Sequence, residues 1–184
     1  MSTTDKVVLV TGASSGIGKA TAEYLAGRGY RVFAGARKPE AVTGLRGGEL
    51  IALDVTDDAS VSAAVAHILA TAGRLDVLVN NAGSSIMGAV EETSVAQAQA
   101  LLDTNVLGVL RMSQAVLPGM RRQHWGRIIN VSSVVGFLPS PFMGVYAASK
   151  HAVEGLSESM DHEVRGFGVR VVVVEPGFTK TNID

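Results

Sequence analysis

The stretch Val7–Gly18 constrains the fold of this chain more than any other part of the sequence. Four apolar, β-favouring residues predict a short buried strand over 7–10, and a turn with three glycines follows directly. Apolar residues then recur at helical spacing, which predicts a helix with an inner face of Ile17, Ala20, Thr21, Tyr24 and Leu25. A strand, a glycine turn and a helix in this order present backbone N–H groups to an anion, normally a pyrophosphate.

Each glycine of this turn has an expected task. Gly12 permits the tight turn, Gly16 lets the backbone approach the phosphates, and Gly18 lets the helix lie close to the strand. The spacing Gly-x-x-x-Gly-x-Gly differs from the common dinucleotide fingerprint Gly-x-Gly-x-x-Gly but uses the same device. Three glycines in seven residues also fit an ordinary flexible loop. The flanking strand and helix favour nucleotide binding, with further contacts expected from Ser14, Ser15 and Ile17.

Strands and helices alternate along the rest of the chain. Apolar runs predict strands at 31–36, 50–53, 75–79, 127–131 and 169–174, and the longest helical patterns span about 94–122 and 146–164. Asp57 is expected to cap a helix with an inner face of Val61, Ala64, Val65, Ile68 and Leu69. The length and the absence of a linker predict a single domain over residues 1–184. Because every predicted strand is a continuous apolar run, we expect an α/β fold class, three-layer and doubly wound, with a parallel sheet covered on both faces.

Polar or glycine-rich residues follow each predicted strand. In a doubly wound sheet, ligands collect outside the carboxyl ends of the strands. The residues concerned are 12–18, 37, 54, 80–83, 132–133 and 176–177. Their agreement predicts one binding site along this edge of the sheet.

Composition excludes several other functions. The 184 residues carry a net charge of −1, so charge gives no reason to expect nucleic acid or an anionic membrane as a partner. There is no cysteine, which excludes disulfides and thiolate chemistry, and the four histidines lack metal-ligand spacing, so no metal site is expected. With a polar N-terminus and no apolar run long enough to span a bilayer, we expect a cytoplasmic enzyme.

Tyr146 and Lys150 are four residues apart at the start of a predicted helix, and therefore lie on one face of it. A tyrosine phenol titrates near pH 10, so acid–base work near neutrality needs a cation beside it. An ammonium one helical turn away and the helix dipole both supply positive potential. Ser133 follows a strand and could donate to a substrate oxygen. Taken alone, Tyr-x-x-x-Lys is more often a surface pair than a catalytic one.

These motifs together resemble the short-chain dehydrogenase/reductase family over essentially the whole chain. The matching segments are Thr11 with the glycine turn, Asn80-Asn81-Ala82-Gly83, Asn105, Ser133, Tyr146-x-x-x-Lys150 and Pro176-Gly177. The amino-acid sequence at 53–56, 91–94 and 175–177 is similar to that of the 17β-hydroxysteroid-dehydrogenase-like branch. The resemblance implies a Rossmann fold with strand order 3-2-1-4-5-6 that binds a nicotinamide cofactor. It also implies hydride transfer between a secondary alcohol and a ketone or aldehyde.

The resemblance also implies roles for four residues. Tyr146 would be the acid in reduction and the base in oxidation, while Lys150 would lower its pKa and hold the nicotinamide ribose. Ser133 would fix the substrate oxygen, although Ser132 is an alternative. Asn105 would hold a water that links Lys150 to solvent, although it could be a helix-interior asparagine satisfied by backbone groups.

Further cofactor contacts are implied at other positions. Asp54 would contact adenine, although it could merely end a strand, and residues 80–83 would line the adenosine, although they could form an ordinary loop. The remaining expected cofactor contacts are Val55, Asn81, Ala82, Gly83, Pro176, Gly177 and, at the nicotinamide carboxamide, Thr181.

The end of the second predicted strand indicates which cofactor is preferred. An acidic residue there would bind the ribose hydroxyls of NAD(H) and repel a 2′-phosphate. This chain has Ala36 followed by Arg37 and Lys38, and a guanidinium presents two parallel donors to a phosphate. We therefore expect NADP(H) to be preferred over NAD(H), with Lys38 either contributing or lying in a solvated basic turn.

The substrate is less well defined by the sequence. Phe137, Leu138, Phe142 and Met143 indicate an apolar pocket wall, hence a lipophilic carbonyl or alcohol substrate, although they could be core or a subunit contact. Relatives usually continue beyond the position of Asp184, so we expect the family's last strand to be missing. A truncated, non-catalytic dinucleotide-binding module is therefore an alternative. A sugar-nucleotide epimerase is disfavoured by the glycine spacing. The two long helices resemble the helices through which members of this family form dimers, so the resemblance implies a homodimer or homotetramer.

Overall fold

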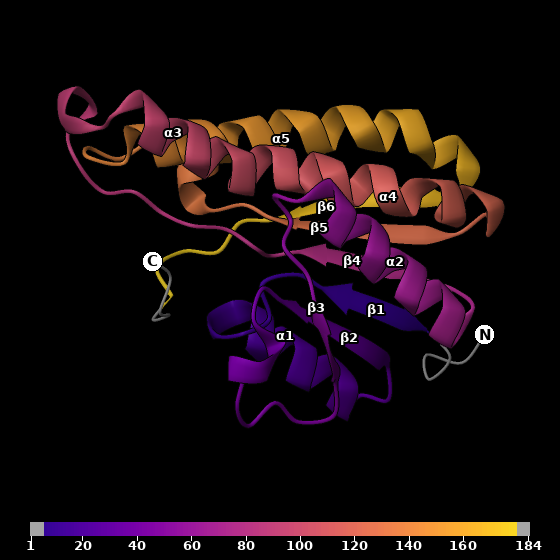
Figure 1. Cartoon of the computed structure of the whole chain (residues 1–184). Coiled ribbons are helices and arrows are strands. Elements are labelled where there is room, and N and C mark those ends of the chain that lie inside the picture. The colour runs from indigo at the N-terminus through magenta and orange to yellow at the C-terminus, as the bar shows by residue number, and fades with distance from the viewer. Residues whose placement is uncertain (1–5, 180–184) are drawn as a thin grey trace.

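The computed structural model describes residues 6–179 and shows a six-stranded parallel sheet (Figure 1). The strand order is β3-β2-β1-β4-β5-β6, which confirms the expected order. The strands are β1 (Val7–Val10), β2 (Arg31–Ala36), β3 (Glu49–Ala52), β4 (Val77–Asn80), β5 (Gly126–Val131) and β6 (Val169–Val174). The order reverses between β1 and β4, so the carboxyl ends of these two strands flank the crevice in which such sheets bind ligands.

Five α-helices connect the strands of the described chain. They are α1 (Gly16–Gly27), α2 (Asp58–Ala72), α3 (Val95–Leu102), α4 (Gly108–Arg122) and α5 (Gly144–Val164). As expected, the Asp57 side chain caps α2 by accepting from the Ala59 backbone N–H over 2.9 Å. No helix within residues 6–179 is both long and apolar enough to span a membrane.

The core has two parts, one on each face of the sheet. On one face, α2, α4 and α5 cover an apolar cluster that includes Phe33, Ile68 and Met112, all of them fully buried. On the other face, α1 packs over β1 and β2 through Ala22 against a smaller cluster around Val10. The three-layer α/β arrangement is therefore confirmed, with α4 and α5 both above the sheet in Figure 1.

The expectation that both faces would be covered is wrong for part of the sheet. Along β6, buried residues alternate with exposed ones, and Val172 and Val174 are 47% and 45% exposed. Within residues 6–179, α1 is the only α-helix on that face, and it packs against β1 and β2. A continuous apolar run therefore does not show by itself that both faces of a strand are buried.

The predicted inner face of the first helix is also partly wrong. Ala20 is exposed and Tyr24 is 63% exposed, whereas Gly18 and Ala22 are buried. The small residues Gly18 and Ala22, four positions apart, let α1 lie close to the sheet. The Tyr24 ring instead lies outside, where Arg28 stacks on it at 5.6 Å.

The helical pattern at 94–122 is not one regular helix. A π-helical segment, η4 (Asp103–Leu107), separates α3 from α4. The extra residue in this turn shifts the helical register, and Asn105 within it is almost fully buried.

Candidate active site

The glycine turn after β1 is shaped by close backbone approaches. Gly12 has a φ of +64°, and a β-carbon there would lie 2.7 Å from the Ala82 Cα. A β-carbon at Gly18 would collide with the Asn81 side chain and the Gly12 carbonyl oxygen. Gly18 is therefore needed because the turn and Asn81 pack closely around it, whereas the expectation was a close contact between the helix and the strand. Ser15 precedes α1 and makes no side-chain cap bond, and no acidic residue occupies the first turn.

The end of β4 holds this turn in place. Asn81 Nδ2 donates to the carbonyl oxygens of Thr11 and Gly12 over 3.0 and 3.1 Å. The side chain of Asn81 thus stabilises the turn, and the residue still lines the cavity beside it. Asn80 does not line the adenosine side as expected, because it is buried and donates to Asn130 Oδ1 over 2.9 Å.

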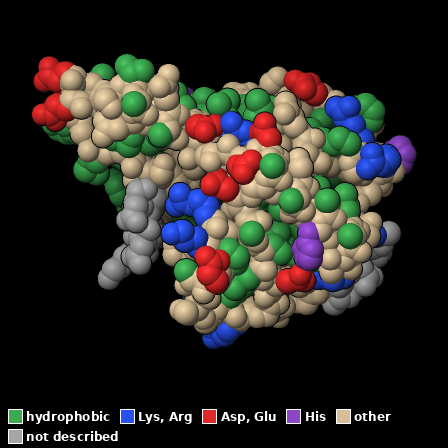
Figure 2. All heavy atoms as spheres, viewed as in Figure 1, with side chains coloured by type: hydrophobic (Ala, Val, Ile, Leu, Met, Phe, Trp, Pro, Cys, Tyr) green, Lys and Arg blue, Asp and Glu red, His purple; other side chains and the backbone are tan. Residues whose placement is uncertain are grey.

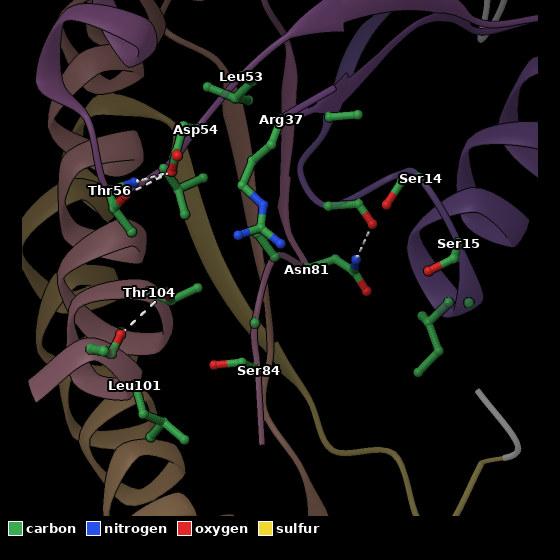
Figure 3. A pocket seen from close by; sticks show the side chains of 18 of the residues that line it. Ser14, Ser15, Arg37, Leu53, Asp54, Thr56, Asn81, Ser84, Leu101 and Thr104 are labelled. Carbon is green, nitrogen blue, oxygen red and sulfur yellow. Dashed lines mark hydrogen bonds between the residues drawn. The ribbon is translucent and has the colours of Figure 1, made fainter. Parts of the chain in front are cut away.

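A cavity of about 540 Å³ lies outside the carboxyl ends of β1, β2 and β4 (Figure 3). Its wall brings together most of the residues expected to bind a cofactor: Gly12, Ser14, Ser15, Gly16, Ile17, Arg37, Asp54, Val55, Asn81, Ala82 and Gly83. Sequence reasoning missed the far wall, which is formed by Ser84, Ile86, Gln97, Ala100, Leu101 and Thr104. The helical period of α3 could have identified Gln97, Leu101 and Thr104 as one face.

Arg37 and Asp54 form the polar end of the cavity. Figure 3 shows the Arg37 guanidinium between Asp54 and Asn81. The Asp54 Oδ1 accepts from the Thr56 backbone N–H over 2.9 Å and from its hydroxyl over 2.7 Å. These bonds, together with the positive charges of Arg37 and Arg111, lower the pKa of Asp54. Asp54 is therefore ionised at neutral pH.

Val55 contributes to the site in a limited way. Its side chain packs against Gly108 at the start of α4, where an added β-carbon would lie 2.8 Å from Val55 Cγ2. The side chain is part of the core, so a cofactor contact from Val55 would involve its backbone.

Tyr146 and Lys150 lie on one face of α5, as expected. The Lys150 Nζ is 5.6 Å from the Tyr146 ring centre and donates to the Val131 carbonyl oxygen over 2.9 Å. Burial lowers the pKa of Lys150 to about 8, although the nearby Glu154 charge partly offsets this effect. Burial raises the pKa of Tyr146, and a hydrogen bond with the Ser133 side chain lowers it.

The two serines after β5 have different surroundings. Ser133 is half-buried and reaches both Tyr146 and the Val135 backbone N–H, the latter over 3.4 Å. Ser132 is buried, and its hydroxyl has no hydrogen-bond partner among the described residues. Of the two, Ser133 is the serine that lies beside Tyr146.

Asn105 is fixed by three hydrogen bonds. Its Oδ1 accepts from the Ser84 backbone N–H over 2.9 Å, and its Nδ2 donates to the Ser84 carbonyl oxygen and the Ser149 hydroxyl over 2.9 and 3.1 Å. The amide therefore ties the loop after β4 to α5. These bonds match the alternative in which the side chain is held by neighbouring groups, while the second lone pair of Oδ1 is still available to a water.

The loop after β6 lies at the carboxyl end of the last strand of the sheet. The Pro176 carbonyl oxygen accepts from the Val134 backbone N–H over 3.0 Å, which holds this loop against the segment that follows Ser133. Gly177 is exposed beside it, and Thr181 lies outside the described residues. The wall of the cavity beside the glycine turn does not include Pro176, Gly177, Ser133, Tyr146 or Lys150. Within residues 6–179, no cluster of side chains is arranged to hold a metal ion.

The family model described as short chain dehydrogenase matches residues 6–184. The chain is 44% identical over 172 residues to a 3-ketodihydrosphingosine reductase of Bacteroides thetaiotaomicron, covering 94% of this chain and 63% of that protein. It is 43% identical over 189 residues to mouse 17-beta-hydroxysteroid dehydrogenase type 1, covering 95% and 54% of the two chains. The chain thus spans roughly three fifths of the length of these curated relatives.

A solved structure adds to the sequence matches. A metagenomic short-chain oxidoreductase in complex with NADP superposes with a TM-score of 0.88 at 36% identity, covering 96% of this chain and 85% of that one. A match over this much of the sequence and of the fold identifies the chain as a member of the short-chain dehydrogenase family.

Proposed function

We propose that this chain forms the cofactor-binding and catalytic part of an NADP(H)-dependent oxidoreductase. Such an enzyme interconverts a secondary alcohol and a ketone or aldehyde on a lipophilic substrate. The observation that carries the proposal is the cluster of Ser133, Tyr146 and Lys150. It lies at the same strand-end edge as the glycine turn.

The residues around the main cavity fit a dinucleotide. The uncapped start of α1 and the positive φ angles at Gly12 and Gly16 form a cradle of backbone groups suited to a pyrophosphate. Arg37 at the opposite end offers a bidentate fork to a 2′-phosphate, whereas a carboxylate at this position would repel one. The NADP complex of the metagenomic relative supports NADP(H), and the preference over NAD(H) rests on Arg37.

The cluster on α5 can move a proton to or from a substrate oxygen. The bound nicotinamide supplies or accepts the hydride. In reduction, Tyr146 donates its phenolic proton to the substrate oxygen, while the Ser133 hydroxyl fixes that oxygen by a hydrogen bond. The Lys150 ammonium makes the resulting phenolate less unfavourable, because the two groups are one helical turn apart. In oxidation the same phenolate accepts the proton.

An apolar rim beside this cluster supports a lipophilic substrate. The loop after β5 exposes Phe137, Leu138 and Phe142, each by more than half of its surface. It contacts the loop after β4, where the Gly88 backbone N–H donates to the Phe142 carbonyl oxygen over 2.8 Å, and Met87 is 77% exposed. Figure 2 shows hydrophobic side chains on the lobe at the upper left, where α3 begins.

A binding module without turnover is the second candidate. One observation favours it: the wall of the main cavity includes the turn after β1 and Arg37 but not Tyr146 or Lys150. Cofactor affinity and proton transfer therefore need separate assays.

Titration of the purified chain with NADPH and NADH, followed by heat or fluorescence, tests the first step. We expect tighter binding of NADPH, because only NADPH carries the phosphate that Arg37 can hold. Oxidation of NADPH with a panel of apolar ketones, monitored by absorbance, tests the second step. NADPH binding without turnover on any ketone would favour the binding module, and no binding of either cofactor would overturn both candidates for this chain.

We also propose that the protein assembles as a homodimer through α4 and α5, the long helices above the sheet in Figure 1. Sedimentation velocity would report twice the chain mass if this is correct, and the mass of one chain would contradict it.

A further inference from the structure

A carboxylate with no role in the proposed function lies one helical turn beyond Lys150. Tyr146, Lys150 and Glu154 are spaced four residues apart on α5 and share one face of the helix. Burial lowers the pKa of Lys150, and among the described residues the charge of Glu154 acts against this by raising it. The two side chains therefore interact through space.

Two oxygens in this region are shielded from solvent and unpaired. Neither Glu154 Oε1 nor Ser132 Oγ has a hydrogen-bond partner among residues 6–179. Buried polar atoms are normally paired, so each unpaired atom indicates a partner that is a water or a ligand.

Gly136 shows that the two oxygens are close together. A β-carbon at this glycine would lie 2.6 Å from Ser132 Oγ and 2.9 Å from Glu154 Oε1. Both oxygens are thus near a single point and at most about 6 Å apart, a separation that one bridging water spans. The Val131 carbonyl oxygen that accepts from Lys150 belongs to the residue just before Ser132. Lysine, serine and glutamate therefore surround the same end of β5.

We propose that Glu154 is a positioning residue which, with Ser132 and a bridging water, keeps the buried Lys150 charged and in place beside Tyr146. The inference rests on the proposed function only for the role of Lys150 in stabilising the Tyr146 phenolate. Glu154 is half-buried, and its shielded Oε1 is less unfavourable beside a cation; Lys150 is the cation that Glu154 acts on in the described chain. Without Glu154, burial would favour neutral Lys150, and the positive charge beside Tyr146 would be lost near neutral pH.

The groups that face Lys150 make the effect specific to Glu154. On α5 these groups are Tyr146, which is neutral near pH 7, and Glu154. From β5 the group is the uncharged Val131 carbonyl oxygen. A change in the titration of Lys150 after substitution of Glu154 is therefore attributable to the missing carboxylate.

The titration of Lys150 can be measured without turnover. The sequence has five lysines, so ¹³C-labelled lysine gives a small set of side-chain NMR signals, and Lys150→Arg assigns the signal of interest. We expect Glu154→Gln to lower the Lys150 midpoint by about one pH unit, because an opposite charge nearby favours the ammonium. Glu154→Asp should return the midpoint toward the wild-type value, and Ser132→Ala should lower it by less.

Glu158→Gln is the matched control, since Glu158 is an exposed glutamate one turn further along α5. It should leave the Lys150 midpoint unchanged. A midpoint that stays constant in both Glu154→Gln and Ser132→Ala would overturn the inference, as would an equal shift in Glu158→Gln. Ser132→Ala also keeps the test decisive if Glu154→Gln fails to fold.

Steady-state assays separate this inference from the proposed function. If the chain reduces ketones, the alkaline limb of its kcat profile should move to lower pH in Glu154→Gln, while NADPH affinity at pH 6 stays near wild type. Absence of turnover in every variant would count against the proposed function, whereas the NMR midpoints would still decide the role of Glu154.

Discussion

Asn81, directly after β4, donates two hydrogen bonds to Thr11, directly after β1, one from its backbone and one from its side chain. The Thr11 Oγ1 accepts from the Asn81 backbone N–H over 3.0 Å, and Asn81 Nδ2 donates to the Thr11 carbonyl oxygen over 3.0 Å. The same hydroxyl also accepts from the Ala82 backbone N–H over 2.9 Å. Thr11 is almost fully buried, so its hydroxyl fixes the position of the glycine turn against β4.

Replacing Thr11 by Val should therefore weaken both the fold and cofactor binding. The isosteric side chain leaves the Ala82 backbone N–H without its partner, at a cost of about 1–3 kcal/mol, and leaves the Asn81 backbone N–H with only its bond to the Val79 carbonyl oxygen. We expect the Tm to fall by several degrees and NADPH affinity to fall roughly tenfold as the turn loosens. Thermal unfolding and calorimetric titration measure the two effects.

Thr11→Ser keeps the hydroxyl and should retain most of the stability. Ser14→Ala, in the exposed part of the same turn, is the matched control and should leave the Tm unchanged. Equal Tm values for Thr11→Val and wild type would show that the hydroxyl does not hold the turn.

Tyr146→Phe tests the assignment of the acid. The change removes only the phenolic oxygen, so ketone reduction should fall by about 10²–10⁴-fold, the usual contribution of a positioned general acid. NADPH affinity should remain close to wild type, because the ring and Lys150 are retained. Steady-state rates and a binding titration on the same preparation give both values. Turnover at the wild-type rate would exclude Tyr146 as the proton donor.

The strand order and the position of the site could be predicted because they depend on local patterns. Each strand is a short apolar run followed by a turn residue, and the carboxyl ends of parallel strands share one edge. Bounds were less accurate: β4 begins at Val77 instead of 75, and Asp76 just before it is a buried carboxylate that accepts from the Val7 backbone N–H. A side-chain role of this kind leaves no trace in an apolar pattern.

Other features depend on contacts between distant segments. The π-helical turn around Asn105 arises because its amide bonds to Ser84, 21 residues earlier, and to Ser149 on α5. The exposed face of β6 depends on which helices lie over it, and the unpaired oxygens of Ser132 and Glu154 depend on the approach of α5 to Gly136. No spacing in the sequence indicates these contacts.

Arg37→Ala tests the choice of cofactor. The loss of a charged, bidentate contact with a 2′-phosphate should weaken NADPH binding by roughly 10–100-fold and leave NADH binding within about twofold. Arg37→Asp should go further and favour NADH, since a carboxylate accepts from the ribose hydroxyls and repels the phosphate. Arg122→Ala, at the exposed end of α4, is the control for loss of one arginine. Equal losses for both cofactors in Arg37→Ala would make Arg37 a structural residue.

Asp161 should make the fold sensitive to acid. Its carboxylate joins the end of α5 to β6, accepting from Arg170 Nε over 2.9 Å, from the Val171 backbone N–H over 2.9 Å and from Arg165 over 3.0 Å. The hydrogen bond from Arg170, followed by that from Val171, lowers the pKa of Asp161 to about 2. Because an unfolded aspartate titrates near pH 4, the stabilisation is complete above about pH 4 and is lost as the pH falls toward 2.

Asp161→Asn should remove this contribution. We expect the variant to lose about 2 kcal/mol of stability at pH 7, which lowers the Tm by roughly 4–8 °C. The difference from wild type should shrink as the pH falls from about 4 to 2, because wild-type Asp161 itself becomes protonated there. Thermal unfolding by circular dichroism between pH 2.5 and 7 measures this, with Glu158→Gln on the exposed face of α5 as the control. A Tm difference that is independent of pH would show that the ionised form of Asp161 does not stabilise the fold.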